Sequence, residues 1–241
     1  MKSLRLSYLL LITSALMSII INADAQSVRG DGNVVQESRN VSSFDRIESN
    51  GVINVYLTHG NAEFIVIEAD KNIIPYVETI VSNSSLKLST QKDVEIKKPT
   101  KLNVYVTFKN IDKLELNGVG NVESQNRLNL NDLTIINSGV GNLKLNLDCE
   151  RLKLDMNAVG NSTLTGRVNN AAIDHNGVGS LKAFDLTTNV MNIQSNGIGN
   201  SEVSSNNEIY INLNGMGNVS YKGNAVVKEL NKNGFGNVKK M

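Results

Sequence analysis

Seven short segments share the pattern Gly-x-Gly-Asn or a close variant of it, a residue set that could bind phosphate. The first is NGVGNVES at residues 117–124, and the last is NGFGNVKK at residues 233–240. Phosphate-binding loops join one strand to one helix, either as G-x-G-x-x-G or as a loop that ends in Gly-Lys-Ser/Thr. No copy has either pattern and no helical periodicity follows any of them. The segments therefore predict a repeated structural element and not seven nucleotide sites.

Side chains that could act as nucleophiles or metal ligands are few and far apart. The chain has two histidines, His59 and His175, and one cysteine, Cys149. Zinc sites need ligands at short regular spacings, which these residues lack. Chain order leaves a Ser-His-Asp triad open, but the G-x-S-x-G turn is missing. We expect both histidines at the surface and Cys149 in the apolar core, and we predict no catalytic residues, no metal site and no cofactor.

Asp155 and Asp174 occupy the same position in two consecutive copies. Two carboxylates about 5 Å apart could bind Ca²⁺ or act as an acid and base pair. The calcium-binding G-G-x-G-x-D repeat is absent, and strand alternation places this position on an outer face near Lys153. A solvated face is the favoured interpretation, and cation binding by the pair stays open.

The copies recur with a regular period, which the second glycine of each copy marks. The successive spacings are 21, 19, 19, 20, 18 and 19 residues, with a mean near 19.3. A corner of the chain needs a positive φ or a close backbone approach, and glycine tolerates both. The predicted corner glycines are Gly120, Gly141, Gly160, Gly179, Gly199, Gly217 and Gly236.

Two columns of the repeat are apolar in every copy when that glycine is numbered 0. Position −6 is aliphatic throughout, from Leu114 to Leu230. Position −1 is apolar throughout, and we predict that its side chains form a buried stack inside the protein. This predicted core stack contains Val119, Val140, Val159, Val178, Ile198, Met216 and Phe235.

Position +1 is asparagine in six copies and Ser180 in the seventh. Amides stacked on identical amides can satisfy one another between neighbouring strands. We therefore predict a structural ladder that Ser180 interrupts. Its members are Asn121, Asn142, Asn161, Asn200, Asn218 and Asn237.

Apolar residues at every second position, as in Leu143, Leu145 and Leu147, indicate strands and not helices. A unit of about 19 residues is too short to bury its own apolar side chains, but stacked units cover one another. The predicted fold is therefore all-β, a β-solenoid with seven rungs about 4.8 Å apart. Opposite charges at position +3, Glu123 beside Lys144 and Lys182 beside Glu202, support this stacking.

The chain before the regular repeats has three predicted parts. Residues 1–25 have the basic start, apolar stretch and Ala23-Asp24-Ala25 site of a cleaved signal peptide. Residues 26–40 are expected to be an exposed segment, and residues 41–113 an irregular β-rich half. The regular repeats then occupy residues 114–241.

The β-rich half contains one degenerate rung. Ile47 and the segment Asn50-Gly51-Val52-Ile53-Asn54 match the repeat columns, with Ile53 in the glycine position. This half is expected either to add irregular rungs to the same sheets, which is favoured, or to form a small β-sandwich docked on them.

The charge balance bears on the possible partners. Removal of residues 1–25 takes away Lys2, Arg5 and Asp24, which leaves 22 basic and 22 acidic residues. A nucleic-acid binder carries a basic excess or stripe, so no nucleic acid is expected as partner. No further apolar stretch is long enough to span a membrane once the signal is cleaved.

The repeat columns, the stretch from Gly51 to Asn54 and the stretch from Tyr221 to Val227 together resemble the head GIN domain family over residues 40–240. The resemblance implies a right-handed β-helical fold and a location in the cell envelope or outside the cell. Members of this family are named as auto-transporter adhesins of Bacteroides-type bacteria. The resemblance implies no catalytic residues.

These observations predict an exported, non-catalytic interaction protein, an adhesin at the bacterial cell envelope or surface with a glycan or a protein as its partner. One alternative is an enzyme that acts on polysaccharide, because β-helices often support such activity. Another is an envelope scaffold or sensor that self-associates through the ends of the solenoid.

Overall fold

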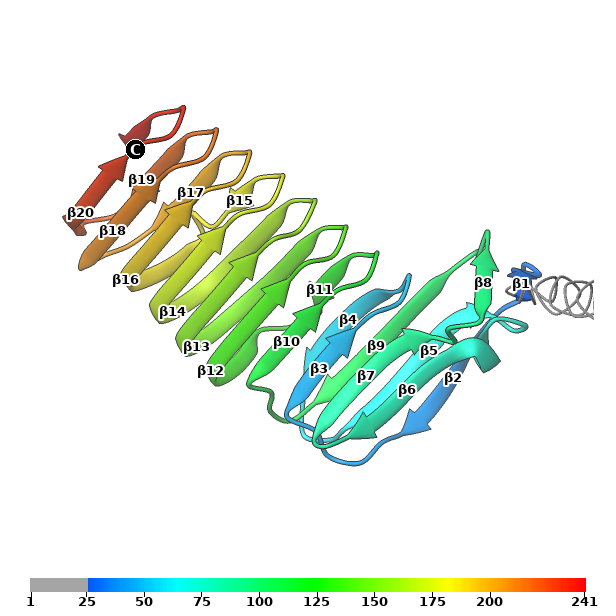
Figure 1. Ribbon diagram of the computed structural model, residues 1–241. Coiled ribbons are helices and arrows are strands. Elements are labelled where there is room, and N and C mark those ends of the chain that lie inside the picture. Colours follow the sequence, from blue (N-terminus) through cyan, green and yellow to red (C-terminus); the bar gives the residue numbers. More distant parts are fainter. Residues whose placement is uncertain (1–25) are drawn as a thin grey trace, which may run out of the picture.

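The computed structural model describes residues 26–241, and the chain forms the predicted β-solenoid of stacked rungs (Figure 1). The expected signal peptide at residues 1–25 lies outside the described residues. Within residues 26–241, no helix has the length and apolar character needed to cross a membrane.

The first part of the chain contains nine strands and one short 3₁₀ helix. These are β1 (Gln26–Arg29), β2 (Val34–Asn40), β3 (Arg46–Ser49), β4 (Asn54–His59), β5 (Phe64–Asp70), η1 (Ile74–Tyr76), β6 (Val77–Ser82), β7 (Ser85–Thr90), β8 (Val94–Lys97) and β9 (Leu102–Phe108).

The regular repeats contain twelve further strands. These are β10 (Lys113–Leu116), β11 (Val122–Ser124), β12 (Leu128–Asn137), β13 (Leu143–Met156), β14 (Ser162–His175), β15 (Leu181–Lys182), β16 (Leu186–Ser195), β17 (Ser201–Ser204), β18 (Glu208–Leu213), β19 (Val219–Lys222), β20 (Val226–Lys232) and β21 (Val238–Lys240).

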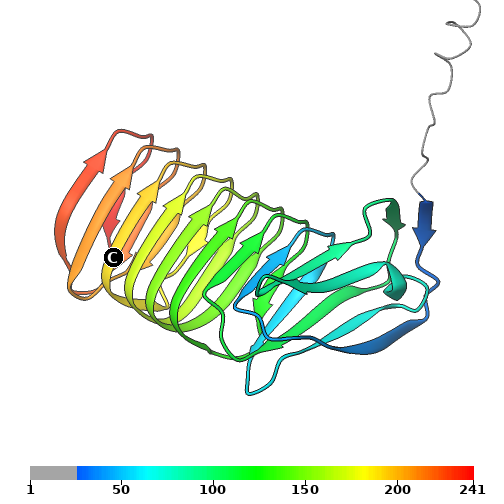
Figure 2. The same ribbon diagram turned by 60° about the horizontal axis from the view of Figure 1, so that its bottom comes forward.

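Each rung has two legs that meet at a Gly-x-Gly corner, and each leg pairs in parallel with the same leg of the next rung (Figure 2). Before the corner, Leu114 pairs with Ile135, and after the corner Val122 pairs with Leu143. The long strands β13 and β14 continue through a second corner, where the pairing skips one residue of each. On the outer face, Lys144 Nζ lies 2.7 Å from Glu123 Oε1, as the +3 column predicts.

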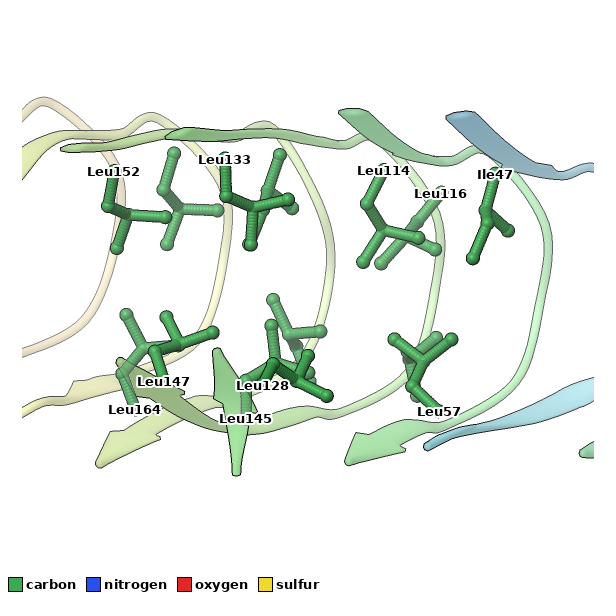
Figure 3. Close-up of a cluster of buried hydrophobic side chains, with 14 of the residues drawn as sticks. Ile47, Leu57, Leu114, Leu116, Leu128, Leu133, Leu145, Leu147, Leu152 and Leu164 are labelled. Atoms are coloured by element: carbon green, nitrogen blue, oxygen red, sulfur yellow. The ribbon is translucent and has the colours of Figure 1, made fainter. Parts of the chain in front are cut away.

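Apolar side chains from the two legs face each other between the sheets and form the core (Figure 3). In column −6, all residues from Leu114 to Ile211 are at most 1% exposed, whereas Leu230 in the last rung is 49% exposed. Each buried aliphatic side chain contributes roughly 1.5–3 kcal/mol relative to an exposed one. Cys149 is also buried in this core, as its apolar surroundings predict.

The prediction of a buried stack at position −1 is wrong. The side chains of Val119, Val140, Val159, Val178, Ile198 and Met216 are 48–52% exposed, and that of Phe235 is 82% exposed. Alternate residues of a strand point to opposite faces. The side chains at positions −6, −4 and +2 point inward. Position −1 is an odd number of residues away from them, so its side chain points outward, as do those at −3 and +1. Parallel bridges join the backbones of consecutive −1 residues, but their side chains point away from the core.

The corner glycines have a steric reason that the structure makes explicit. Gly160 has φ 143°, and a Cβ added there would lie 2.0 Å from the carbonyl oxygen of Gly141 in the preceding rung. The other six second glycines have φ between 140° and 156° and the same close approach, at 1.8–2.1 Å. A side chain at this position would need both a disfavoured backbone and a displaced neighbour.

The irregular half continues the same two stacks in an unexpected chain order. The degenerate rung of β3 and β4 lies between β10 and β11 on one side and β7 and β9 on the other. Beyond β7 and β9, the sheets change to antiparallel pairing with β6 and β5, and β2 then pairs with β5. The Arg39 guanidinium on β2 donates to the carbonyl oxygens of Val77 and Ile74, and so joins the two sheets at this end.

Replacement of a corner glycine tests this geometry. Gly160→Ala is expected to destabilise the protein by about 3 kcal/mol or more, since backbone strain and a steric overlap add. Gly32→Ala is the matched control, because Gly32 also has a positive φ but a Cβ there meets nothing within 4 Å. Its expected loss is about 1–2 kcal/mol. Equal losses in denaturant unfolding would show that the close approach between rungs has no energetic weight.

Candidate functional site

An uncharged ridge runs along the Gly-x-Gly corners of eight consecutive rungs. It consists of positions −3 to +1, which are residues 50–54, 117–121, 138–142, 157–161, 176–180, 196–200, 214–218 and 233–237. None of these forty positions is Asp, Glu, Lys, Arg or His, although one fifth of the chain is charged and about eight charges would be expected. The spacing of about 4.8 Å between rungs gives the ridge a length of about 34 Å.

The crest of the ridge is a line of apolar side chains, the residues at position −1. Val52 begins the line with 60% exposure and Phe235 ends it with 82%. Each intermediate side chain is covered on two sides by its neighbours in the column and is open to solvent on its outer half. Contiguous exposed apolar residues of this extent mark interaction surfaces in soluble proteins.

One flank of the crest is the asparagine ladder at position +1. The backbone N–H of Asn142 donates to Asn121 Oδ1 at 3.0 Å, and the N–H of Asn161 donates to Asn142 Oδ1 at 3.1 Å. Ser180 donates its N–H to Asn161 Oδ1 at 2.9 Å but has no amide to offer the following rung. The bonds resume from Asn218 to Asn200 and from Asn237 to Asn218. Each of these amide oxygens thus accepts the backbone N–H of the next corner.

The other flank is a second amide ladder, at position −3. Asn117 Nδ2 donates to Asn50 Oδ1 at 3.1 Å, and Asn196 Nδ2 donates to Asn176 Oδ1 at 2.8 Å. Asn233 Nδ2 continues the row to Asn214 Oδ1 at 3.2 Å. This ladder was not predicted from the sequence, although asparagine at −3 in six of the seven copies is the signal that could have revealed it.

The backbone N–H groups at positions −1 and 0 of the ridge pair between neighbouring rungs. The N–H of Val119 donates to Gly51 O at 3.0 Å, and the N–H of Gly120 donates to Val140 O at 2.9 Å. The same two bonds recur in the following corners. Burying an unpaired backbone group costs about 1–3 kcal/mol, so this pairing allows a ligand to dehydrate the crest cheaply.

Acidic residues gather in a different place, a hollow of about 330 Å³ at the second corner. There the Asp148 carboxylate is held by Arg167 Nη2 at 2.8 Å, and Glu150 accepts a hydrogen bond from Asn169. Burial, reinforced by Asp148, raises the pKa of the neighbouring Cys149 thiol to about 12. The thiol is therefore protonated at neutral pH, which does not suit a nucleophile.

The predicted pair Asp155 and Asp174 does lie in register on adjacent strands. Burial and contact with the Asp155 carboxylate raise the pKa of Asp174, and Lys153 offsets this only in part. The two carboxyl groups interact directly enough to shift this pKa, so they lie side by side on neighbouring strands. Within residues 26–241, no three His, Cys, Asp or Glu residues converge as a metal site would require.

The expectation of two surface histidines is wrong for His175, which is 1% exposed. It occupies column −4, which varies in sequence but points inward. Its Nδ1 lies 3.0 Å from Ser201 Oγ, and Ser201 Oγ lies 3.4 Å from Ser195 Oγ, so three polar side chains form a buried cluster. His175 Nε2 has no hydrogen-bond partner among the described residues, and burial lowers the pKa of the imidazole.

The fold and the ridge define a class, the β-solenoids whose corners are built from glycine and stacked asparagine. Residues 43–225 match the family described as "Putative auto-transporter adhesin, head GIN domain". The match covers more than half of the chain, and the chain belongs to this family.

Solved structures with this fold include proteins from Bacteroides and Parabacteroides species. A "putative adhesin" from Bacteroides fragilis NCTC 9343 shares 27% identity and a TM-score of 0.85, over 89% of this chain and 100% of that one. A "putative adhesin" from Parabacteroides merdae ATCC 43184 shares 20% identity and a TM-score of 0.66, over 90% and 100% of the two chains. The latter likeness concerns the fold alone. No curated protein matches the chain.

Acid sensitivity follows from the buried imidazole. An unfolded histidine takes up a proton below pH 6.5, whereas the lowered pKa of His175 keeps the native state neutral there. Stability is therefore expected to fall as the pH drops below 6.5. His175→Met, which resembles Met156 one rung earlier, should flatten this pH dependence, and His59→Gln should leave it unchanged. A thermal midpoint that falls equally with pH in both variants would contradict the assignment.

The pair Asp155 and Asp174 predicts a pH dependence of stability opposite to that of His175. Because the pKa of Asp174 is raised above 3.8, the ionised native state is penalised at neutral pH. Asp174→Asn is expected to raise the thermal midpoint at pH 7, and the gain should disappear as the pH falls to 3.8. Asp132→Asn is the control, since its carboxylate pairs with Arg151 at 2.5 Å and its loss should not stabilise. No gain at neutral pH for Asp174→Asn would contradict the repulsion.

Proposed function

We propose that this chain is an exported, non-catalytic interaction protein that acts as an adhesin at the bacterial cell envelope or surface, with the uncharged ridge as its adhesive surface. Its family and the similar structure from Bacteroides fragilis carry adhesin names, which supports a binding role. The observation that carries the proposal is the exclusion of charge from all forty ridge positions while the crest stays apolar and exposed.

The chemistry of the ridge favours a neutral, extended glycan as ligand. An uncharged surface gives no electrostatic gain to an acidic polymer such as a nucleic acid. Alternating apolar and amide groups match the apolar faces and hydroxyl groups of a sugar chain. A repeat every 4.8 Å or so offers the same contact to successive units of a polymer, and such multivalent contacts add to a high avidity from weak single contacts.

The two alternatives have less support in the structure. An enzyme that acts on polysaccharide needs separated carboxyl groups beside its substrate, and the ridge has no carboxyl group at all. End-to-end assembly would use the last rung, where Leu230 is half exposed. However, Lys232 stands at the inward position that Leu213 fills one rung earlier, and the pairing of β18 with β20 contains a bulge. Inward charges and bulges both oppose pairing at a sheet edge.

The ridge proposal is tested by removing the crest without adding charge. The triple variant Val140→Ser, Val159→Ser and Val178→Ser is expected to keep the fold, since all three side chains are half exposed. Loss of about 1 kcal/mol per side chain should weaken binding to an array of neutral glycans about a hundredfold. Circular dichroism and the thermal midpoint report whether the fold persists.

The matched control changes three outward side chains of column +3 instead, by Lys144→Ser, Thr163→Ser and Lys182→Ser. This variant should bind neutral glycans like the unchanged chain. Equal losses in the two variants, binding to acidic glycans alone, or capture of no glycan would each overturn the proposal. Protease treatment of intact cells gives an independent check, because an adhesin must be cleaved from outside.

A further inference from the structure

A second exposed feature lies at the opposite end of the molecule from the last rung. Arg29 ends β1, and Gly30 and Asp31 begin the turn that leads to β2. Strands β1 and β8 project from that end as a small separate sheet (Figures 1 and 2). The Arg29 and Asp31 side chains are exposed. The sequence predicted only an exposed segment at residues 26–40, and no role for this charged triplet was predicted.

The structure holds the backbone of this triplet from both sides. Asn72 Nδ2 donates to Arg29 O at 2.7 Å, and the N–H of Asp31 donates to Asn72 Oδ1 at 3.2 Å. The N–H of Gly30 donates to Lys97 O at 3.1 Å. One amide side chain and one strand thus fix the spacing of the two charged residues.

A buried carboxylate anchors the same turn. Asp70 is fully buried and accepts hydrogen bonds from the N–H of Gly32 at 2.7 Å and from the N–H and Oγ1 of Thr100 at 2.7 and 2.8 Å. A Cβ at Gly30 would lie 2.8 Å from Asp70 Oδ2, so only glycine fits against this anchor. Gly30 and the turn therefore have structural roles of their own, which leaves the two charged side chains to be explained.

The charges of Arg29 and Asp31 are not paired with other charged side chains of the fold. Within residues 26–241, neither the Arg29 guanidinium nor the Asp31 carboxylate forms an ion pair within 4.0 Å. The one bond that Asp31 makes is local, since its Oδ1 accepts the N–H of Asn33 at 2.9 Å. An asparagine would accept that bond equally well, so the turn needs an oxygen at residue 31 but not a charge.

We propose that Arg29, Gly30 and Asp31 form a recognition site for an adhesion receptor that carries a divalent cation and an acidic pocket. A guanidinium forms a bidentate pair with a carboxylate, and a free carboxylate is a preferred ligand for Mg²⁺ with an open coordination position. Integrins bind Arg-Gly-Asp segments through this chemistry, which makes an integrin ectodomain the suitable probe. This site is independent of the ridge.

The test measures binding of the chain, tagged at its C-terminus, to an immobilised fibronectin-binding integrin ectodomain in Mg²⁺. Saturable binding that a chelator abolishes is expected. Asp31→Asn keeps the acceptor for Asn33 but removes the metal ligand, and Arg29→Gln removes the guanidinium. Each is expected to weaken binding at least tenfold, the loss typical of a charged contact of 1.5–3 kcal/mol.

Two controls separate this site from general effects. Asp93→Asn changes an exposed carboxylate beside β8 and should leave integrin binding unchanged. The crest variant with three serines should also bind integrin normally, so failure of the ridge proposal and failure of this one are distinguishable. No binding, binding that persists without a divalent cation, or full binding by Asp31→Asn would each overturn the inference.

Discussion

The contact on which the whole repeat depends is the approach of one corner's carbonyl oxygen to the Cα of the glycine in the next rung. In all seven copies a Cβ at position 0 would lie within 2.1 Å of that oxygen. In the adjacent column −2 an added Cβ would lie 2.1–2.3 Å from a carbonyl oxygen, but the backbone there is less restricted, and one copy carries Ala158. Column 0 combines the close approach with a positive φ, and it is glycine in all seven regular copies. The strict column is thus the one where two independent constraints coincide.

This constraint explains why the corner itself performs no chemistry. Most of its backbone N–H groups are paired between rungs or with the asparagine oxygens of the ladder, so these polar groups serve structural contacts. The side chains at −1 are the ones that make no hydrogen bond within the corner. Strand preference accounts for β-branched residues there, but threonine would satisfy it as well as valine. The column contains Val, Ile, Met and Phe and no threonine. Contact with neighbours in the column explains part of this apolar character, and the exposed half is left for a ligand.

The period, the strands and the corner glycines could be predicted from sequence because each is a local rule repeated seven times. The apolar composition of column −1 gave the wrong prediction, because its side chains are exposed. The alternation of inward and outward positions along each strand, which the same columns contain, gives the correct direction. His175 shows the converse case, a polar residue in an inward column. Local rules could not give the order of the first rungs, since Val52 and its partner Val119 are 67 residues apart and seven strands, β4 to β10, lie between them in the chain. The hydrogen bond from Asn72 to the carbonyl oxygen of Arg29 also joins two residues that no sequence pattern relates.

The two proposed surfaces differ in the physics that each can use. The ridge is uncharged and repeated, so its binding strength grows with the number of rungs engaged and depends little on salt. The turn at residues 29–31 is charged and occurs once, so it must be rigid to bind well, because ordering a mobile segment costs free energy on binding. Asn72 and the buried Asp70 supply that rigidity. Burial alone raises the pKa of Asp70, but the bonds from Thr100 and Gly32 outweigh it and hold the pKa below its usual value. The anchor therefore stays ionised at any pH where other carboxyl groups do, and the turn keeps its shape over the same range.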